Sequence, residues 1–328
     1  MVKIINNLVA LAVIGIAFCG LASASTLSFD HYWTYDEIQT YLNELDAEFP
    51  QIGHIDVYGT TAEGRPLTAF CIHKEHAARA GLPVIFIEAG IRPREWIGVM
   101  ASLYFLHEVV EHYYEFDALL DYFEIVVIPV ANPDGYVYSH NVERLWNKNR
   151  RSVGSGCFGA DINANFRYQF VYRDDPCAEN YPGSSYFSEV ESQQLVSFVT
   201  SVKYANRVSV YISLQSFGQQ ILLPYNYFNI ASGNHAAALA IANSAATAIR
   251  TVNPSRVYNV GVGAALRGNS FGTSTDYAKG FLNVEYVYTF MLPSGGTSGF
   301  EVPEAEMPAI IAEAFAGLYA ITSGIGGF

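Results

Sequence analysis

The sequence predicts an α/β fold: a single domain with a mixed, largely parallel twisted sheet flanked by helices. Short runs of β-branched and aromatic residues, several of them apolar throughout, alternate with segments whose apolar residues recur at helical spacing. Strands that are apolar on both faces are typical of a sheet covered by helices on both sides. The 328 residues are 51% hydrophobic and 15% charged, which excludes disordered and collagen-like chains. Pro and Gly are spread over short turns, so we expect one domain.

The periodic segments give the expected elements in chain order. Helical spacing predicts helices at 34–49, 96–112, 188–202, 235–252 and 303–321. The β-branched and aromatic runs predict strands at 54–59, 67–73, 83–90, 122–130, 207–216 and 283–292. Ligands bind beyond the carboxyl ends of the strands in open sheets of this kind. We therefore expect functional residues just after the strands at 83–90, 122–130, 207–216 and 283–292.

Residues 1–24 have the pattern of a secretory signal peptide. Lys3 gives a basic start, an apolar run extends over 8–18, and Ala22 to Ala24 form a small-residue cleavage site. The apolar run is shorter than the roughly 20 residues that a membrane span requires. We therefore expect the chain to be secreted into the extracellular space, with 25–328 as the mature domain.

The charge balance narrows the range of partners. The formal net charge is −13, with 18 basic and 31 acidic residues. Binding to nucleic acid phosphates needs Lys and Arg concentrated on one face, so nucleic acid is excluded as a partner. The Ala-rich final helix is interrupted by Glu304, Glu306 and Glu313, which predicts a packing helix rather than a membrane span.

The cysteines fit an oxidising compartment. Cys157 and Cys177 lie in loop-like sequence and can close a short loop, which suits a surface disulfide. Cys71 lies in an apolar strand-like run and is expected to be a buried thiol.

Several polar segments lie where functional residues are expected, and together they are similar to one known family. They are 91–96 (IRPREW), 131–136 (ANPDGY), 143–148 (ERLWNK), 161–163 (DIN), 214–216 (LQS), 222–227 (LLPYNY) and 287–290 (VYTF). With the cysteine pair and the start of the mature chain, these segments resemble the zinc carboxypeptidases of the pancreatic A/B type. The resemblance implies hydrolysis of one residue from a peptide's carboxyl end. It also implies a zinc ion held by His and Glu in an H-x-x-E pattern and by a later His, with a Glu as general base.

The chain departs from that pattern at the residues that carry the chemistry. The first His position is Arg92, the Glu position is kept as Glu95, the second His position is Gln215, and the general-base position is Met291. A guanidinium has no lone pair for a metal, and a neutral amide oxygen suits Ca²⁺ better than Zn²⁺. A thioether cannot accept a proton, and loss of a general base alone costs about 10²–10⁴ in rate. We therefore expect neither bound zinc nor hydrolysis.

The replacements suggest a new contact. We expect Arg92 and Glu95 to form a bidentate ion pair across the family's metal site, because an unpaired buried carboxylate is costly.

The resemblance also marks positions that hold substrate. The family clamps the terminal carboxylate with an Asn-Arg pair, which corresponds here to Asn163 and Ala164. An Arg that polarises the scissile carbonyl corresponds to Asn147. Arg94 and Arg144 stand where the family has arginines further out along the groove. These positions are expected to leave part of a peptide groove, weaker for a free carboxylate.

Two further positions follow from the same resemblance. The mobile Tyr that caps the substrate corresponds to Gly268, with Arg267 beside it. The specificity position on the pocket floor corresponds to Thr275, which is small and neutral and favours neither a basic nor an acidic side chain.

Other candidate sites have simpler interpretations. The histidine-containing segments 73–76 and 107–115 are interpreted as a polar strand end and a solvated helix end, because neither lies at a strand-to-helix switch point with a third ligand in view. The Asn132 to Gly135 segment (NPDG) is interpreted as a turn.

Three functions remain open on this basis. The favoured one is a secreted, non-catalytic pseudo-peptidase that binds a peptide or protein and needs no cofactor. The second is an active metallocarboxypeptidase that uses Glu95 with atypical zinc ligands. The third is a structural component of a secreted fluid.

Overall fold

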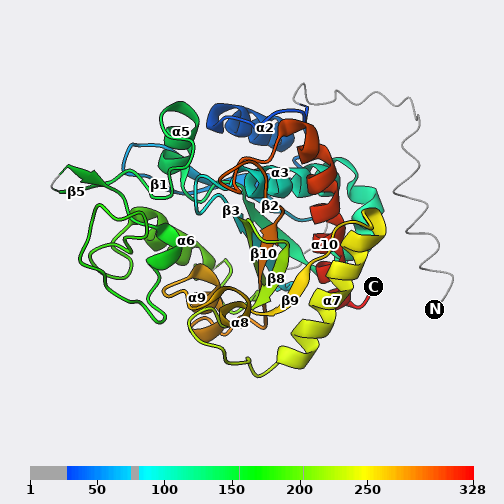
Figure 1. Ribbon diagram of the computed structural model, residues 1–328. Helices are drawn as coiled ribbons and strands as arrows, with labels where there is room; N and C mark the ends of the chain where they lie inside the picture. Colours follow the sequence, from blue (N-terminus) through cyan, green and yellow to red (C-terminus); the bar gives the residue numbers. More distant parts are fainter. Residues whose placement is uncertain (1–27, 75–80, 155, 202) are drawn as a thin grey trace.

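The computed structural model describes residues 28–74, 81–154, 156–201 and 203–328, so the expected signal peptide at 1–24 lies outside the described residues. Within them, an eight-stranded sheet runs through the centre in the order β1-β2-β4-β3-β7-β10-β8-β9 (Figure 1). Its strands are β1 (Gly53–Thr60), β2 (Pro66–Ile72), β3 (Val84–Ala89), β4 (Glu124–Ile128), β7 (Val208–Ser216), β8 (Gln220–Leu223), β9 (Asn259–Val262) and β10 (Tyr286–Leu292). A separate hairpin pairs β5 (Ser152–Gly154) with β6 (Cys157–Phe158).

The pairing confirms a mixed, largely parallel sheet. The central strands β4, β3, β7 and β10 are all parallel to their neighbours in that order, and β8 is parallel to β9. The antiparallel pairs are β1 with β2, β2 with β4, and β8 with β10. All six expected strands are present. The sequence pattern missed β8 and β9, because four residues are too few for a periodicity to emerge.

All five expected helices are present, with shifted ends at two of them. The helices are α2 (Tyr35–Glu48), α3 (Trp96–Glu111), α4 (Asp117–Tyr122), α5 (Pro133–Asn141), α6 (Val190–Val199), α7 (His235–Val252), α8 (Gly263–Arg267), α9 (Ser274–Gly280) and α10 (Met307–Gly326). Single 3-10 turns are η1 (Tyr113–Phe116), η2 (Ile162–Ala164) and η3 (Glu304–Glu306). The turn η3 precedes α10, so the last helix begins later than its apolar pattern suggested.

The central strands β3, β4 and β10 are buried on both faces, which explains why they are largely apolar. On β3, Ile85 and Ile87 pack into the core that includes α2, α3, α7 and α10. Val84 and Phe86 on the same strand point to the opposite core, which includes α6 and α9. In Figure 1, α7 and α10 lie on one side of the sheet, and α6 and α9 lie on the other.

The last helix is long and apolar enough to cross a membrane, by length and composition. In this fold it packs against α7 and α3. At Gly317 an added Cβ would lie 2.9 Å from both Ile249 and Phe290, so the backbone approaches its neighbours closely. Glu313 on this helix is buried and paired with Arg256, at 2.9 Å between Oε2 and Nε. These contacts are those of a core helix, as expected.

The segment from Asn132 to Gly135 is more than a turn. Asn132 caps α5, because its Oδ1 accepts from the backbone N of Gly135 at 3.1 Å. Pro133 occupies the first helical position, where its missing N–H costs nothing. Asp134 is fully buried and accepts hydrogen bonds from Thr61 Oγ1 and Arg65 Nη1, both at 2.7 Å. The four residues therefore start a helix and tie it to the β1–β2 hairpin.

Candidate functional site

The candidate site lies at the carboxyl ends of the parallel strands, as expected. Arg92 and Glu95 follow β3, and Glu95 is the residue that precedes α3. Gln215 and Met291 lie near the ends of β7 and β10, and they are partners in the parallel register of these strands. Asp161 reaches the same place from the segment that precedes η2. Sheet topology thus gathers residues that are far apart in the sequence.

Arg92 is held on two sides. Its Nε and Nη2 both donate to Oδ2 of Asp161, each at 3.2 Å. Its Nη1 donates to Oε1 of Gln215 at 3.1 Å. The expected bidentate pair with Glu95 is wrong: within the described residues, the carboxylate paired with Arg92 is Asp161. The physical reason is that a second buried carboxylate, Asp161, lies within hydrogen-bond distance of the guanidinium, and a buried carboxylate without a cation is costly.

Glu95 remains under the influence of Arg92 without contacting it. The side chain is 2% exposed, and Oε2 accepts a hydrogen bond from the backbone N of Ser216 at 3.1 Å. Burial raises the pKa of Glu95 to about 7, although the charge of Arg92 and the bond from Ser216 oppose this rise. The carboxyl group is therefore close to half-protonated at neutral pH.

Gln215 and Met291 lie side by side at the ends of β7 and β10. Gln215 uses both ends of its amide, since Oε1 accepts from Arg92 and Nε2 donates to Ser213 Oγ at 2.8 Å. Met291 is buried and offers a thioether. Its partner in the register of the two strands is Gln215, whose amide oxygen accepts a hydrogen bond from Arg92.

These residues do not fit a zinc ion at the family's position. A guanidinium has no lone pair, and the amide oxygen that could bind a metal instead accepts a hydrogen bond from it. Of the family's three ligand positions, Glu95 alone retains a donor that zinc prefers, whereas catalytic zinc sites use three protein ligands. The Arg92 guanidinium already supplies a positive charge where the family holds zinc, so no step of the function proposed below involves the metal.

A polar cavity of about 200 Å³ opens beside Arg92. Asn163 and Ala164, at the family's carboxylate clamp, both contribute to its lining. Asn163 is fixed from behind, because its Oδ1 accepts from the backbone N of Ser274 at 3.0 Å. The lining also includes the exposed Arg173. The full set is Arg92, Asp161, Asn163, Ala164, Val171, Arg173, Asn180, Pro182, Asn269, Ser270 and Phe271.

The residues expected further out along the groove are largely engaged within the fold. Arg144 donates to the backbone carbonyls of Arg94 and Phe300, at 2.8 and 2.7 Å, and stacks over Trp96 with 3.6 Å to the ring centre. Arg94 pairs with Glu179 and lies over the ring of Phe300. Both arginines brace the loops around the site. They are thus less available to a ligand than their positions in the family pattern implied.

Asn147, at the position of the carbonyl-polarising arginine, is buried. Its Nδ2 donates to the backbone O of Glu179 at 3.4 Å, and its Oδ1 has no hydrogen-bond partner among the residues that the structure describes. It therefore faces protein and does not project into the cavity.

The last three expected positions are Arg267, Gly268 and Thr275. Gly268 has φ +81, in the left-handed region that favours glycine, and a Cβ there would meet open space. Arg267 beside it donates from Nη1 to Phe217 O and Gln220 Oε1, both at 3.0 Å. Thr275 is buried and accepts from Asn226 Nδ2 at 3.0 Å, so its hydroxyl is used inside the protein.

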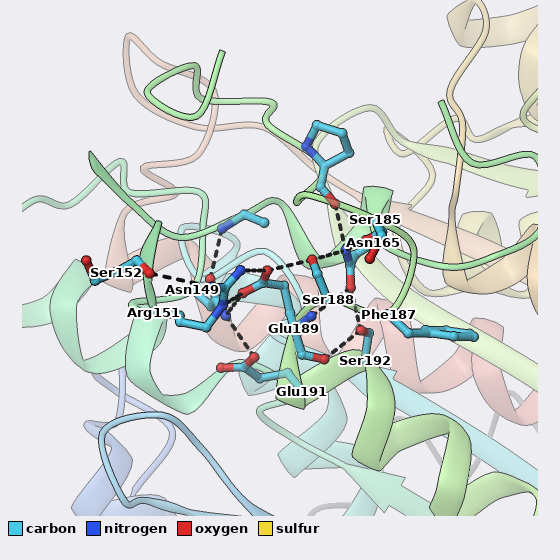
Figure 2. Close-up of polar contacts among 12 residues, drawn as sticks. Asn149, Arg151, Ser152, Asn165, Ser185, Phe187, Ser188, Glu189, Glu191 and Ser192 are labelled. Carbon is cyan, nitrogen blue, oxygen red and sulfur yellow. Dashed lines mark hydrogen bonds and ion pairs between the residues drawn. The ribbon is translucent and has the colours of Figure 1, made fainter. Parts of the chain in front are cut away.

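The wall that carries Asp161 and Asn163 is held by a disulfide and a buried polar network. Cys157 and Cys177 are bonded as expected, and Cys71 is buried and free. Figure 2 shows the network at the start of α6, where the Glu189 carboxylate accepts from Asn149 Nδ2 at 2.9 Å and from Arg151 Nε at 2.9 Å. Burial raises the pKa of Glu189, but the bonds from Arg151 and Asn149 outweigh it and lower the pKa overall.

A second group in Figure 2 anchors the chain just beyond η2. Asn165 donates from Nδ2 to the backbone carbonyls of Pro182 and Ser185, at 2.6 and 2.9 Å. Its Oδ1 accepts from Ser192 Oγ at 2.6 Å. The cavity wall is therefore tied to α6 at several points.

Sequence reasoning missed two carboxylates at the site. Asp161 lies within a segment that supported the family resemblance, yet its pairing with Arg92 depends on contact across 69 positions in the chain. Glu88 is a fully buried acid inside an apolar strand, where it accepts from Ser274 Oγ at 2.5 Å and Tyr211 OH at 2.7 Å. Burial raises the pKa of Glu88. The signal in the sequence was a single acidic residue, Glu88, within an otherwise apolar strand.

Comparisons with known proteins agree with the fold. The family model for zinc carboxypeptidases matches residues 38–317. Carboxypeptidase B of Astacus astacus is 31% identical over 302 residues, covering 90% of this chain and 98% of that protein. Carboxypeptidase A1 of Rattus norvegicus is 32% identical over 293 residues, covering 86% of this chain and 68% of that protein.

Solved structures show the same similarity. Carboxypeptidase A from Helicoverpa armigera superposes with a TM-score of 0.85 at 29% identity, covering 99% of this chain and 81% of that one. Bovine thrombin-activatable fibrinolysis inhibitor, solved in complex with tick carboxypeptidase inhibitor, gives a TM-score of 0.83 at 27% identity, covering 92% and 99%. With the family model matching most of its length, the chain belongs to the zinc carboxypeptidase family.

Proposed function

We propose that this chain is a secreted, non-catalytic pseudo-peptidase that binds a carboxylate-bearing segment of a peptide or protein without cleaving it. The observation that carries the proposal is the Arg92 guanidinium, which is fixed between Asp161 and Gln215 where the family would hold zinc. Secretion rests on the leader pattern at 1–24, with 25–328 as the mature domain, and the disulfide is compatible with an oxidising compartment.

The absence of hydrolysis follows from the residues present. Peptide hydrolysis by this family needs a metal that activates water and a base that takes its proton. Arg92 and Met291 can do neither. Glu95, whose pKa of about 7 would suit a base, is buried and bound to Ser216. It is nevertheless the specific reason to test the alternative, an active metallocarboxypeptidase with atypical ligands.

The cavity supports binding of a carboxylate group. Arg173 is exposed at its rim, and Asn163, Asn180 and Asn269 bring amide groups to its lining. Guanidinium and amide donors match the acceptor oxygens of a carboxylate or a peptide. A related protein has been solved in complex with a protein inhibitor, which supports a peptide or protein as the partner.

The test measures binding and cleavage in parallel. Purified mature protein is titrated calorimetrically with a peptide panel in matched free-acid and carboxyl-amide forms, and mass spectrometry follows the same peptides with and without added Zn²⁺. We expect binding that favours the free acids and no release of residues in either condition. Arg173→Gln should weaken binding about two- to fivefold, the worth of a partly exposed charge contact. Arg250→Gln, on the exposed side of α7, is the matched control and should bind as wild type.

A reverted variant serves as the positive control for chemistry. Arg92→His/Gln215→His/Met291→Glu restores the family's metal ligands and base, and it should take up about one zinc per chain. Release of carboxyl-terminal residues by the wild-type chain would replace the proposal with the active alternative. Failure of the whole panel to bind, with no cleavage, would leave the structural component of a secreted fluid as the better description.

A further inference from the structure

A second cluster of metal-ligating side chains lies on the β1–β2 hairpin, at the edge of the sheet. His54 and Asp56 are two positions apart on β1, so they share one face of the strand. Cys71 on β2 is the direct cross-strand partner of His54. His73 follows two positions after Cys71 and therefore reaches the same face. The antiparallel register thus brings an imidazole, a carboxylate and a thiol together from two separate strands.

The distances within this cluster are short. Cys71 Sγ lies 3.4 Å from Asp56 Oδ2, and His54 Nε2 lies 3.6 Å from Asp56 Oδ1. One donor atom from each of these three residues falls within 4.8 Å of the other two. Tetrahedral zinc with bonds of about 2.0–2.3 Å places its ligand atoms about 3.5 Å apart. The three side chains therefore need only small movements to surround one ion.

A cation already lies among these donors. Lys203 Nζ is 2.7 Å from Asp56 Oδ2 and 3.1 Å from His54 Nε2. Because an ammonium group only donates, His54 Nε2 must present its lone pair toward Lys203. His54 Nδ1 then carries the proton and donates to His73 Nε2 at 2.9 Å. The imidazole is thus fixed in the tautomer that metal ligation through Nε2 requires, with His73 as the orienting partner.

We propose that His54, Asp56 and Cys71 form a zinc site, separate from the family's catalytic position. Imidazole nitrogen, carboxylate oxygen and thiolate sulfur are the three ligand types that zinc prefers in proteins. On binding, the Cys71 S–H proton passes to solvent and a Zn–S bond forms. The Lys203 side chain moves away and remains a protonated ammonium group. Solvent water occupies the fourth coordination position. Lys203 is 38% exposed at its side chain, so it can swing into solvent and open the entry path.

The site was not visible in the sequence pattern. The segment 73–76 was interpreted as a polar strand end, whereas in the fold His73 contacts His54 across the hairpin. The proposal is also independent of peptide binding, because none of these residues lines the cavity beside Arg92.

The test uses Co²⁺ as a spectroscopic probe for zinc on the full mature chain, under anaerobic conditions without reductant, so that the Cys157–Cys177 disulfide stays intact. We expect one equivalent of Co²⁺ to produce thiolate-to-metal charge-transfer absorption and tetrahedral d–d bands, both removed by one equivalent of Zn²⁺. Cys71→Ser should abolish the charge-transfer band. Lys203→Met, which removes the competing ammonium, should tighten binding about two- to fivefold.

Two further variants distinguish this site from metal binding elsewhere on the chain. Glu95→Gln, at the family's metal position, should leave the Co²⁺ spectrum unchanged. His54→Ala, at a partly exposed position, should weaken binding at least about tenfold, the effect typical of losing a ligand or its support. Circular dichroism confirms that each variant is folded before titration. Absence of a thiolate band in the wild-type chain, its survival in Cys71→Ser, or its loss in Glu95→Gln would overturn the proposal.

Discussion

Arg92 changes the electrostatics of the site while keeping its charge balance. A zinc ion would supply positive charge to the carboxylates around it, and the guanidinium supplies a permanent positive charge from within the chain. Its donors reach Asp161 and Gln215, and its field opposes the rise in the pKa of Glu95 caused by burial. A single residue thus stabilises a pocket that would otherwise hold uncompensated buried acids.

Removal of that charge should destabilise the protein. Arg92→Ala leaves Asp161, which is 4% exposed, and Glu95 without a cation. We expect the free energy of unfolding to fall by about 2–4 kcal/mol, somewhat less than for a fully buried pair because the Arg92 side chain is 23% exposed. Urea denaturation followed by circular dichroism measures this change.

A double-mutant cycle identifies the partner. If the Arg92–Asp161 contact carries the effect, Arg92→Ala/Asp161→Ala should lose clearly less than the sum of the two single variants. Arg250→Ala on the exposed side of α7 controls for the loss of an arginine. An additive cycle, or an unchanged midpoint for Arg92→Ala, would show that this ion pair does not stabilise the fold.

The family resemblance singled out Arg92, Glu95, Gln215 and Met291, and in the fold each lies just after or near the end of a buried strand. It could not identify the partner of Arg92. That choice depends on which of two buried carboxylates the guanidinium reaches, and only the packed loops decide it.

At the scale of elements, buried strands were predictable and short or capped elements were not. The strands β3 and β7 are buried on both faces over much of their length, so their apolar runs stand out in the sequence. The four-residue β9 has no fully buried position and gives no such signal. Helix α5 was hidden because Asn132 and Pro133 begin a turn and a helix with the same residue types.

The Cys157–Cys177 disulfide closes a loop that carries part of the cavity wall. The two cysteines are 20 positions apart, and Asp161, Asn163 and Arg173 lie between them. Cross-linking a loop of this length lowers the entropy of the unfolded chain by the equivalent of about 3 kcal/mol. Cys157→Ser/Cys177→Ser should therefore unfold at lower urea concentration, with a loss of about 2–4 kcal/mol.

The matched comparison is the wild-type chain treated with dithiothreitol. It should lose about the same stability as the double variant, because both lack only the cross-link. Equal unfolding midpoints for oxidised and reduced protein would mean that the segment is held by the network around Glu189 rather than by the disulfide.

Across the whole molecule, buried acids from different regions share one property. Burial raises the pKa of Glu95 and of Glu191 to about 7, and that of Asp276 to about 6. Glu191 lies in the network at the start of α6, where Oε2 accepts from Asn149 and Oε1 has no hydrogen-bond partner in the described part of the chain. The chain has a formal net charge of −13, so the partial protonation of Glu95 and Glu191 near neutral pH lowers its self-repulsion.

The raised pKa of Glu191 predicts a pH dependence of stability with a definite sign. Between pH 4.5 and 7 this carboxyl is ionised in the unfolded chain and still protonated in the fold, so the folded state binds more protons and its stability falls as pH rises. The lowered pKa of His140, about 4, acts in the opposite direction, so the total dependence of stability on pH contains contributions of both signs.

The variant Glu191→Gln removes only the contribution of Glu191. The free energy of unfolding of this variant minus that of wild type should therefore rise between pH 4.5 and 7, by about 3 kcal/mol at most, and stay level above pH 7. Urea denaturation at several pH values from 4.5 to 8.5 gives this difference. Glu115→Gln, which removes an exposed carboxylate, controls for the loss of one negative charge. Parallel curves for Glu191→Gln and wild type would mean that the buried carboxyl ionises alike in the folded and unfolded states.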